Sequence, residues 1–202
     1  MIPTLKEVID GLNGAWLLAM RDPDALRCFN TSAEGFWKSF WVILLGLPVW
    51  LWLMLNMPAY LDEMASLTSQ HYLQPTMARF LLAQGIAYLL GWILFPVIMH
   101  YVARLIDASA NYVPFVVARN WALLLSLFIL SVPPSSLYNL GIIGAEVRFS
   151  LELLATALGL IYLWQVTVVS LKVPGVLAVG LVSLDFFLTL VVFDVSGYLS
   201  VR

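Results

Sequence analysis

Charged side chains are scarce in this chain. Asp, Glu, Lys and Arg together make up 11% of the 202 residues, whereas a soluble domain carries roughly 25%. Hydrophobic residues make up 62% of the sequence, and the mean hydropathy is +0.93. So few charges cannot cover a surface of this size in water, and we therefore expect the chain to fold in lipid.

The sequence also lacks the residues that several classes of function require. Its one cysteine, Cys28, excludes an intramolecular disulfide and a multi-cysteine metal site. The net charge of −2 provides no basic field for nucleic acid. A glycine-rich phosphate loop, a GxSxG turn and an HExxH motif are all missing. We therefore expect no cofactor, no metal, no nucleic-acid partner and no enzymatic activity.

The first residues do not resemble a secretory signal. Lys6, Glu7 and Asp10 interrupt them, and the apolar run AWLLAM is shorter than the roughly 7–15 apolar residues of a signal peptide. We expect the chain to keep these residues and to insert through its own spans.

Five apolar runs are long enough to cross a bilayer, which takes about 20 residues. They cover residues 36–56, 80–104, 115–133, 151–171 and 174–194. Unpaired backbone groups find no water in lipid, so each run must be helical. The sequence predicts an all-α, polytopic membrane helical bundle with about five transmembrane helices.

An amphipathic helix is predicted before the first span. Apolar residues recur at helical spacing (Leu5, Val8, Ile9, Leu12, Trp16 and Met20), with polar residues opposite (Lys6, Glu7, Asp10 and Asn13). This pattern is typical of a helix in the plane of the membrane surface, and a partner-binding helix would look the same. We divide the chain into a cytoplasmic interfacial segment, 1–30, and a five-span domain, 31–202.

The basic residues predict the orientation. With the N-terminus in the cytoplasm, seven of them lie inside (Lys6, Arg21, Arg27, Lys38, Arg104, Arg119 and Lys172) and three lie outside (Arg79, Arg148 and Arg202). Positive-inside bias therefore predicts a cytoplasmic N-terminus and an external C-terminus.

Asp185 lies near the middle of the fifth span, in LVSLDFFLTLVV. An aspartate at this depth costs about 2.5–3.5 kcal/mol on insertion scales. At 100° per residue it shares a face with Ala178, Thr189 and Ser196, so we expect it to face protein. Counting equal rises from the tight turn before the span places Tyr162 and Gln165 level with it. These three residues form a predicted intramembrane polar cluster, which either fixes helix packing or takes part in transport.

A second candidate cluster lies at the inner end of the second span. His100, Arg104 and Asp107 share one helix face there, and Arg119 with Asn120 opens the next span. The cluster could bind a phosphate or a partner at the cytoplasmic face. The alternative is interface anchoring with an internal Arg104–Asp107 pair. His100 alone does not make a metal site.

The layout resembles the Yip domain family, small membrane proteins with a cytoplasmic N-terminal segment and five spans. The resemblance covers about 34–195. It rests on the order of the spans, on the basic loop YVARLIDASANYVPF with a proline entering the third span, and on Trp164 before the last hairpin. It implies a non-enzymatic membrane organiser or accessory protein, in a bacterial inner membrane, and assigns no site.

Two functional hypotheses follow. In the first, the protein is a membrane scaffold or accessory subunit that binds other membrane proteins, or further copies of itself, through its spans and cytoplasmic surface. In the second, it is a small transporter or channel component with Asp185 as a protonatable or ion-binding group. A membrane enzyme acting on lipids is a third possibility, but the sequence shows no acid/base constellation for it.

Overall fold

The computed structural model describes residues 2–67 and 75–201, and these form helices joined by short connections. In chain order the elements are α1 (Leu5–Ala19), η1 (Ala25–Cys28), α2 (Ala33–Ser39), α3 (Val42–Leu67), α4 (Met77–Leu105), η2 (Ser109–Asn111), α5 (Tyr112–Ser126), the π-helical η3 (Leu127–Ser131), α6 (Val132–Asn139), α7 (Ala145–Leu171) and α8 (Gly175–Val201).

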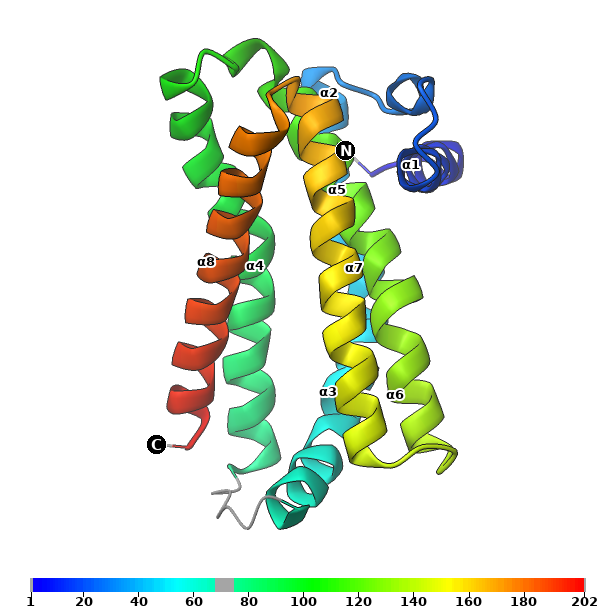
Figure 1. The fold of residues 1–202 in the computed structure, drawn as a ribbon, viewed down its shortest axis with the longest axis vertical. Helices are drawn as coiled ribbons and strands as arrows, with labels where there is room; N and C mark the ends of the chain where they lie inside the picture. Colours follow the sequence, from blue (N-terminus) through cyan, green and yellow to red (C-terminus); the bar gives the residue numbers. More distant parts are fainter. Residues whose placement is uncertain (1, 68–74, 202) are drawn as a thin grey trace.

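Five helical segments of the described chain are long and apolar enough to cross a membrane, as predicted. They are Ala33–Leu67, Met77–Leu105, Ser109–Asn139, Ala145–Leu171 and Gly175–Ser200. The all-α polytopic architecture is therefore confirmed. The spans run roughly parallel, with α4 and α8 side by side on the left of Figure 1.

The bundle has two ends, which we call proximal and distal. The proximal end carries α1, α2, η2 and the α7–α8 turn, and the distal end carries the end of α3, the start of α4, the α6–α7 connection and the end of α8 (Figure 1). The helix α1 is seen almost end-on in this view, so it lies across the direction of the spans.

The third span is the centre of the bundle. Half of its apolar window is buried inside the protein, against 17–28% for the other four spans. Many other apolar side chains of those four spans are exposed on the outer surface, which a lipid environment would solvate.

The third span is longer than the sequence predicts. We expected it to end at Pro133, but the helix continues through α6 to Asn139. Pro133 and Pro134 supply no backbone N–H, and the chain passes them through the single π-helical segment η3, directly before α6. Neighbouring helices make such an interruption tolerable within a membrane.

The rotation of α8 agrees with its sequence pattern. Ala178, Asp185 and Ser196 are buried, whereas Val176 and Phe187 on the opposite face are 89% and 62% exposed. The tight turn before α8 depends on Lys172, whose φ of 57° places it in the left-handed region. Trp164 Nε1 donates to the Gly175 carbonyl at 2.9 Å and ties the two ends of this turn together.

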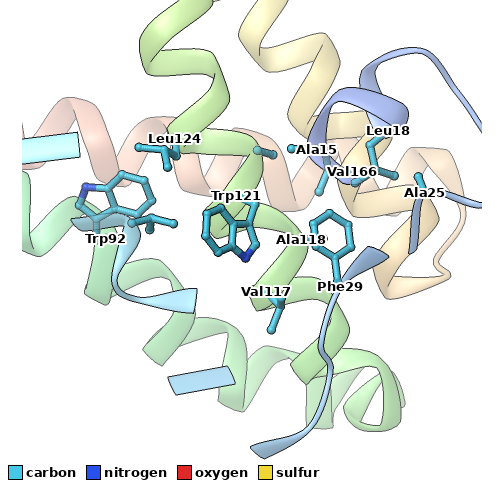
Figure 2. Packing of buried hydrophobic residues seen from close by; sticks show 12 residues of the cluster. Ala15, Leu18, Ala25, Phe29, Trp92, Val117, Ala118, Trp121, Leu124 and Val166 are labelled. Atoms are coloured by element: carbon cyan, nitrogen blue, oxygen red, sulfur yellow. The ribbon is translucent and has the colours of Figure 1, made fainter. Parts of the chain in front are cut away.

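A hydrophobic cluster joins the proximal helices to the bundle. Figure 2 shows Trp121 of α5 in the middle of it, with Phe29, Ala15 and Leu18 on one side and Trp92 on the other. A Cβ atom at Gly11 of α1 would overlap the Trp121 ring. The close approach of α1 to α5 therefore requires glycine at this position.

Candidate functional site

The candidate site is a buried ion pair between α5 and α8. Arg119 Nε donates to Asp185 Oδ2 at 3.0 Å, and Arg119 Nη2 lies 2.8 Å from both carboxylate oxygens. The two residues are 3% and 7% exposed. Such a bidentate pair is the strongest hydrogen-bonding arrangement open to a carboxylate, and it leaves no net charge in the span.

An aromatic ring completes the surroundings of the pair. The Arg119 guanidinium carbon lies 4.7 Å from the centroid of the Phe95 ring on α4. Its Nη1 finds no hydrogen-bond partner among the described residues, and the electron-rich ring face adds a favourable contact for the cation. The pair thus connects α4, α5 and α8 near the middle of the bundle.

The predicted partners of Asp185 were wrong. Tyr162 Oη donates to the Ala15 carbonyl at 2.6 Å, and the Gln165 amide donates to the Leu18 carbonyl. Both side chains therefore hydrogen-bond to α1 and not to Asp185. Counting rises from the turn estimates depth along the α7–α8 hairpin, but it does not say which side of α7 faces α8.

The sequence contained a signal for the correct partner. Arg119 stands two turns inside an apolar helix, and we had assigned it to the cytoplasmic loop because it lies near the start of the span. A lone cation within one span and a lone acid within another are expected to pair in lipid. Arg119 therefore no longer counts among the basic residues on the cytoplasmic side.

The contacts of Tyr162 and Gln165 dock the amphipathic helix α1. Their acceptors lie in its C-terminal half, and an ion pair holds its N-terminal half, with Lys38 Nζ 2.8 Å from Glu7 Oε1. Hydrogen bonds from Lys38 and from the Thr4 backbone lower the pKa of Glu7 to about 2. The carboxylate is therefore ionised at any physiological pH.

The apolar stripe of α1 is divided between two environments. Val8 and Leu12 pack against the hydrophobic cluster, whereas Leu5, Ile9 and Trp16 are 76%, 55% and 49% exposed. Tyr162 belongs to a span and lies more than two turns before the end of α7. These hydrogen bonds therefore hold α1 against the side of α7, within the length of that span.

The predicted cytoplasmic-face cluster is separated into two parts. His100, Arg104 and Asp107 are exposed at the proximal end of α4, and the His100 ring packs edge-on against Tyr112 at 5.4 Å. Arg119 is in the bundle, and Asn120 Nδ2 donates to Ser39 Oγ at 2.9 Å, which joins α5 to α2. Within the part of the chain that the structure describes, no ion pair joins Arg104 to Asp107.

A distal cluster was not predicted from the sequence. Arg148 of α7 is 1% exposed, and its Nε donates to Glu152 Oε1 at 2.8 Å. Its guanidinium carbon lies 3.9 Å from the Tyr60 ring centroid and 5.1 Å from that of Tyr138. Tyr138 Oη donates to Glu63 at 2.7 Å. The cluster joins α3, α6 and α7, and the Arg–Glu spacing of four residues was the available signal.

Comparisons with family models, with curated proteins and with solved structures found no match for this chain. In residues 2–67 and 75–201, no three His, Cys, Asp or Glu side chains come together as metal ligands would.

Proposed function

We propose that the protein is an integral membrane scaffold or accessory subunit, without enzymatic activity, that binds partners through its spans and its proximal surface. The observation that carries this proposal is the buried Arg119–Asp185 pair. It accounts for the acid in the fifth span as a contact that fixes how α5 and α8 pack.

The alternative proposal, a transporter or channel component, makes a different demand on the same residue. A carboxylate that carries protons or ions must leave its partner and meet water from at least one side. Here both oxygens accept hydrogen bonds from Arg119, and the residue is 7% exposed. This arrangement favours a fixed pair over an exchanging one.

The proximal surface supports a binding role. The end of α4 presents Tyr101 and Leu105, 63% and 83% exposed, beside the exposed His100 and Arg104. The helix α2 adds Trp37, 65% exposed. Aromatic and arginine side chains of this kind are enriched where proteins bind one another.

We propose further that the proximal end is cytoplasmic and that the C-terminus is external. Six basic residues lie in the proximal elements: Lys6, Arg21, Arg27, Lys38, Arg104 and Lys172. In the distal elements the structure describes Arg79 and Arg148, and Arg202 lies outside the described residues. The bias supports this orientation. Membership of the Yip domain family and a bacterial inner membrane remain proposals that rest on the sequence resemblance.

Water access beside the pair tests the proposal. In a Cys28→Ser background, Val182→Cys and Thr189→Cys place thiols about one turn to either side of Asp185 and leave the pair intact. The exposed Asp107→Cys serves as the positive control. Sealed vesicles are treated with a membrane-impermeant thiol reagent on each side in turn.

The scaffold proposal predicts that Asp107→Cys is labelled and that the two flanking cysteines are labelled only after denaturation. Labelling of either flanking cysteine in the folded protein would show a water path to the pair, and the transport alternative would then replace the scaffold.

A further inference from the structure

The helix α1 presents three different faces to its surroundings. Its sequence fits two occupants of the apolar side, the membrane and a partner protein, and the directions of the three faces distinguish them. We infer that the exposed apolar face of α1 lies among the acyl chains of the leaflet at the proximal end, and that it needs no anionic headgroup there. The inference requires only that the spans lie in a membrane, and it does not depend on the scaffold proposal.

Two of the faces contact the rest of the protein. Ala15 and Leu18 are buried against the bundle. The polar face contacts α2, where Lys38 Nζ lies 2.8 Å from Glu7 Oε1. Because α2 lies nearer than α1 to the proximal tip of the bundle (Figure 1), the polar face of α1 points toward that end.

The third face of α1 is apolar and open. Its side chains are Leu5, Ile9, Trp16 and Met20, which are 76%, 55%, 49% and 63% exposed. Trp16 follows Glu7 by nine residues, and at about 100° per residue it lies on the opposite side of the helix. Since Glu7 points toward the proximal end, the apolar face points the other way, along the spans and into the bilayer.

The contacts with α7 give the depth of α1. The 27 residues of α7 make it about 40 Å long, against about 30 Å for the hydrocarbon core, so a centred span extends about 5 Å past the core at each end. Tyr162 and Gln165 precede Leu171, the last residue of α7, by about 13 and 9 Å along the axis. Both residues that hold α1 therefore lie about 4–8 Å inside the core, the depth at which interfacial helices bury their apolar faces.

The lipid-facing surface of α7 continues onto α1. Leu158 and Ile161 are 47% and 54% exposed, and they lie within the same turns of α7 as Tyr162, which holds α1. Apolar side chains of a span that no other helix covers face acyl chains. The same lipids therefore reach the apolar face of α1 from below.

The charges of α1 do not select an anionic lipid. Within Leu5–Ala19, which the structure describes in full, Lys6 Nζ lies 2.7 Å from Asp10 Oδ2, and Glu7 is paired with Lys38. Interfacial helices that are attracted to anionic lipids carry an excess of Lys or Arg on the polar face. The polar face of α1 has no such excess, so its apolar area alone attaches it to the leaflet.

Spin labels report the environment of each face by electron paramagnetic resonance. In a Cys28→Ser background, Leu5→Cys and Ile9→Cys place labels on the apolar face, and Lys6→Cys places one on the polar face between them. Leu158→Cys supplies the reference for a label among acyl chains. The protein is reconstituted into phosphatidylcholine vesicles. Collisions with oxygen, which concentrates among acyl chains, are compared with collisions with a water-soluble nickel chelate.

We expect the labels at Leu5 and Ile9 to collide with oxygen as the Leu158 reference does and to lose the nickel collisions that the label at Lys6 keeps. Adding phosphatidylglycerol to the vesicles should leave this pattern unchanged. All four side chains are exposed, so the substitutions leave the buried contacts of α1 in place, and the two positions on the apolar face test it twice.

Each contrary result identifies a different occupant. Nickel collisions at both Leu5 and Ile9 would place the apolar face in water and overturn the inference. Protection of both labels from oxygen and from nickel would show that a second copy of the chain covers the face, because no other protein is present. A contrast with Lys6 that appears only with phosphatidylglycerol would show that headgroup charge attaches α1, and the inferred independence from anionic lipid would be wrong.

Discussion

Breaking the Arg119–Asp185 pair should lower the stability of the bundle much more than breaking an ion pair on the protein surface. Removing one partner leaves an uncompensated charge among apolar side chains, which costs about 3–5 kcal/mol. We expect about 3 kcal/mol for Asp185→Asn, the low end of that range, because the Phe95 ring still stabilises the remaining cation. Arg119→Gln leaves a carboxylate that can take up a proton and become neutral, so it should cost no more than Asp185→Asn.

The double variant should lose less stability than the sum of the losses in the two single variants. With both charges removed, two amides remain, and these can bond to one another. We expect the Arg119→Gln/Asp185→Asn protein to lose about 1–2 kcal/mol. The coupling energy of the cycle should therefore be at least about 2 kcal/mol.

The assay is unfolding by sodium dodecyl sulfate in mixed micelles, followed by tryptophan fluorescence. The control cycle uses Lys6 and Asp10, an exposed pair at 2.7 Å with side chains 85% and 40% exposed. Its coupling energy should be below about 0.5 kcal/mol. Additive losses at Arg119 and Asp185, equal to those of the control, would refute the assignment of a buried pair that holds α5 and α8 together.

Three further predictions concern the docking of α1. Tyr162→Phe and Gln165→Leu each remove one hydrogen bond to α1, so each should weaken the docking of α1 by about 0.5–1.5 kcal/mol. The loss should be seen as faster amide hydrogen exchange in α1, with the exchange in the spans unchanged. Gly11→Ala inserts a methyl group into the contact with α5 and should cost about 1–3 kcal/mol; an unchanged melting temperature would contradict the close approach. The pKa of Glu7 is lowered to about 2 from 4.5, so its contribution to docking is complete above about pH 4.5 and is lost as the pH falls toward 2; Lys38→Met should return this pKa toward 4.5 in an NMR titration.

Much of the fold could be predicted from the sequence. Sustained apolar runs predicted five spans, because the thickness of the bilayer sets the minimum length of an apolar helix that crosses it. Periodicity predicted the buried face of α8, since a charged side chain among small residues must turn away from lipid. The ends of the spans were predicted less well: the third span continues past its two prolines, where we expected it to end.

The candidate site could be predicted from the sequence only in part. Asp185 stood out because an acid in lipid requires an explanation, and its burial agrees with the predicted rotation of α8. Its partner was missed because Arg119 lies near the start of its span and was assigned to the loop, although a cation within one span and an acid within another are expected to pair. The Arg148 cluster combines side chains of α3, α6 and α7, and only the spacing of Arg148 and Glu152 within α7 was visible in the sequence.

The sequence by itself determined the class of this protein, the number of its spans and the buried face of the span that carries Asp185, because these depend on the balance between each side chain and lipid. The tertiary structure alone decided which buried face meets which neighbour: that Asp185 meets Arg119, and that Tyr162 and Gln165 meet α1. The physical reason is that lipid tails and leucine side chains are equally apolar. Hydrophobicity therefore cannot distinguish the surface of a span that faces another helix from the surface that faces the membrane, and only packing and the pairing of buried polar groups choose between them.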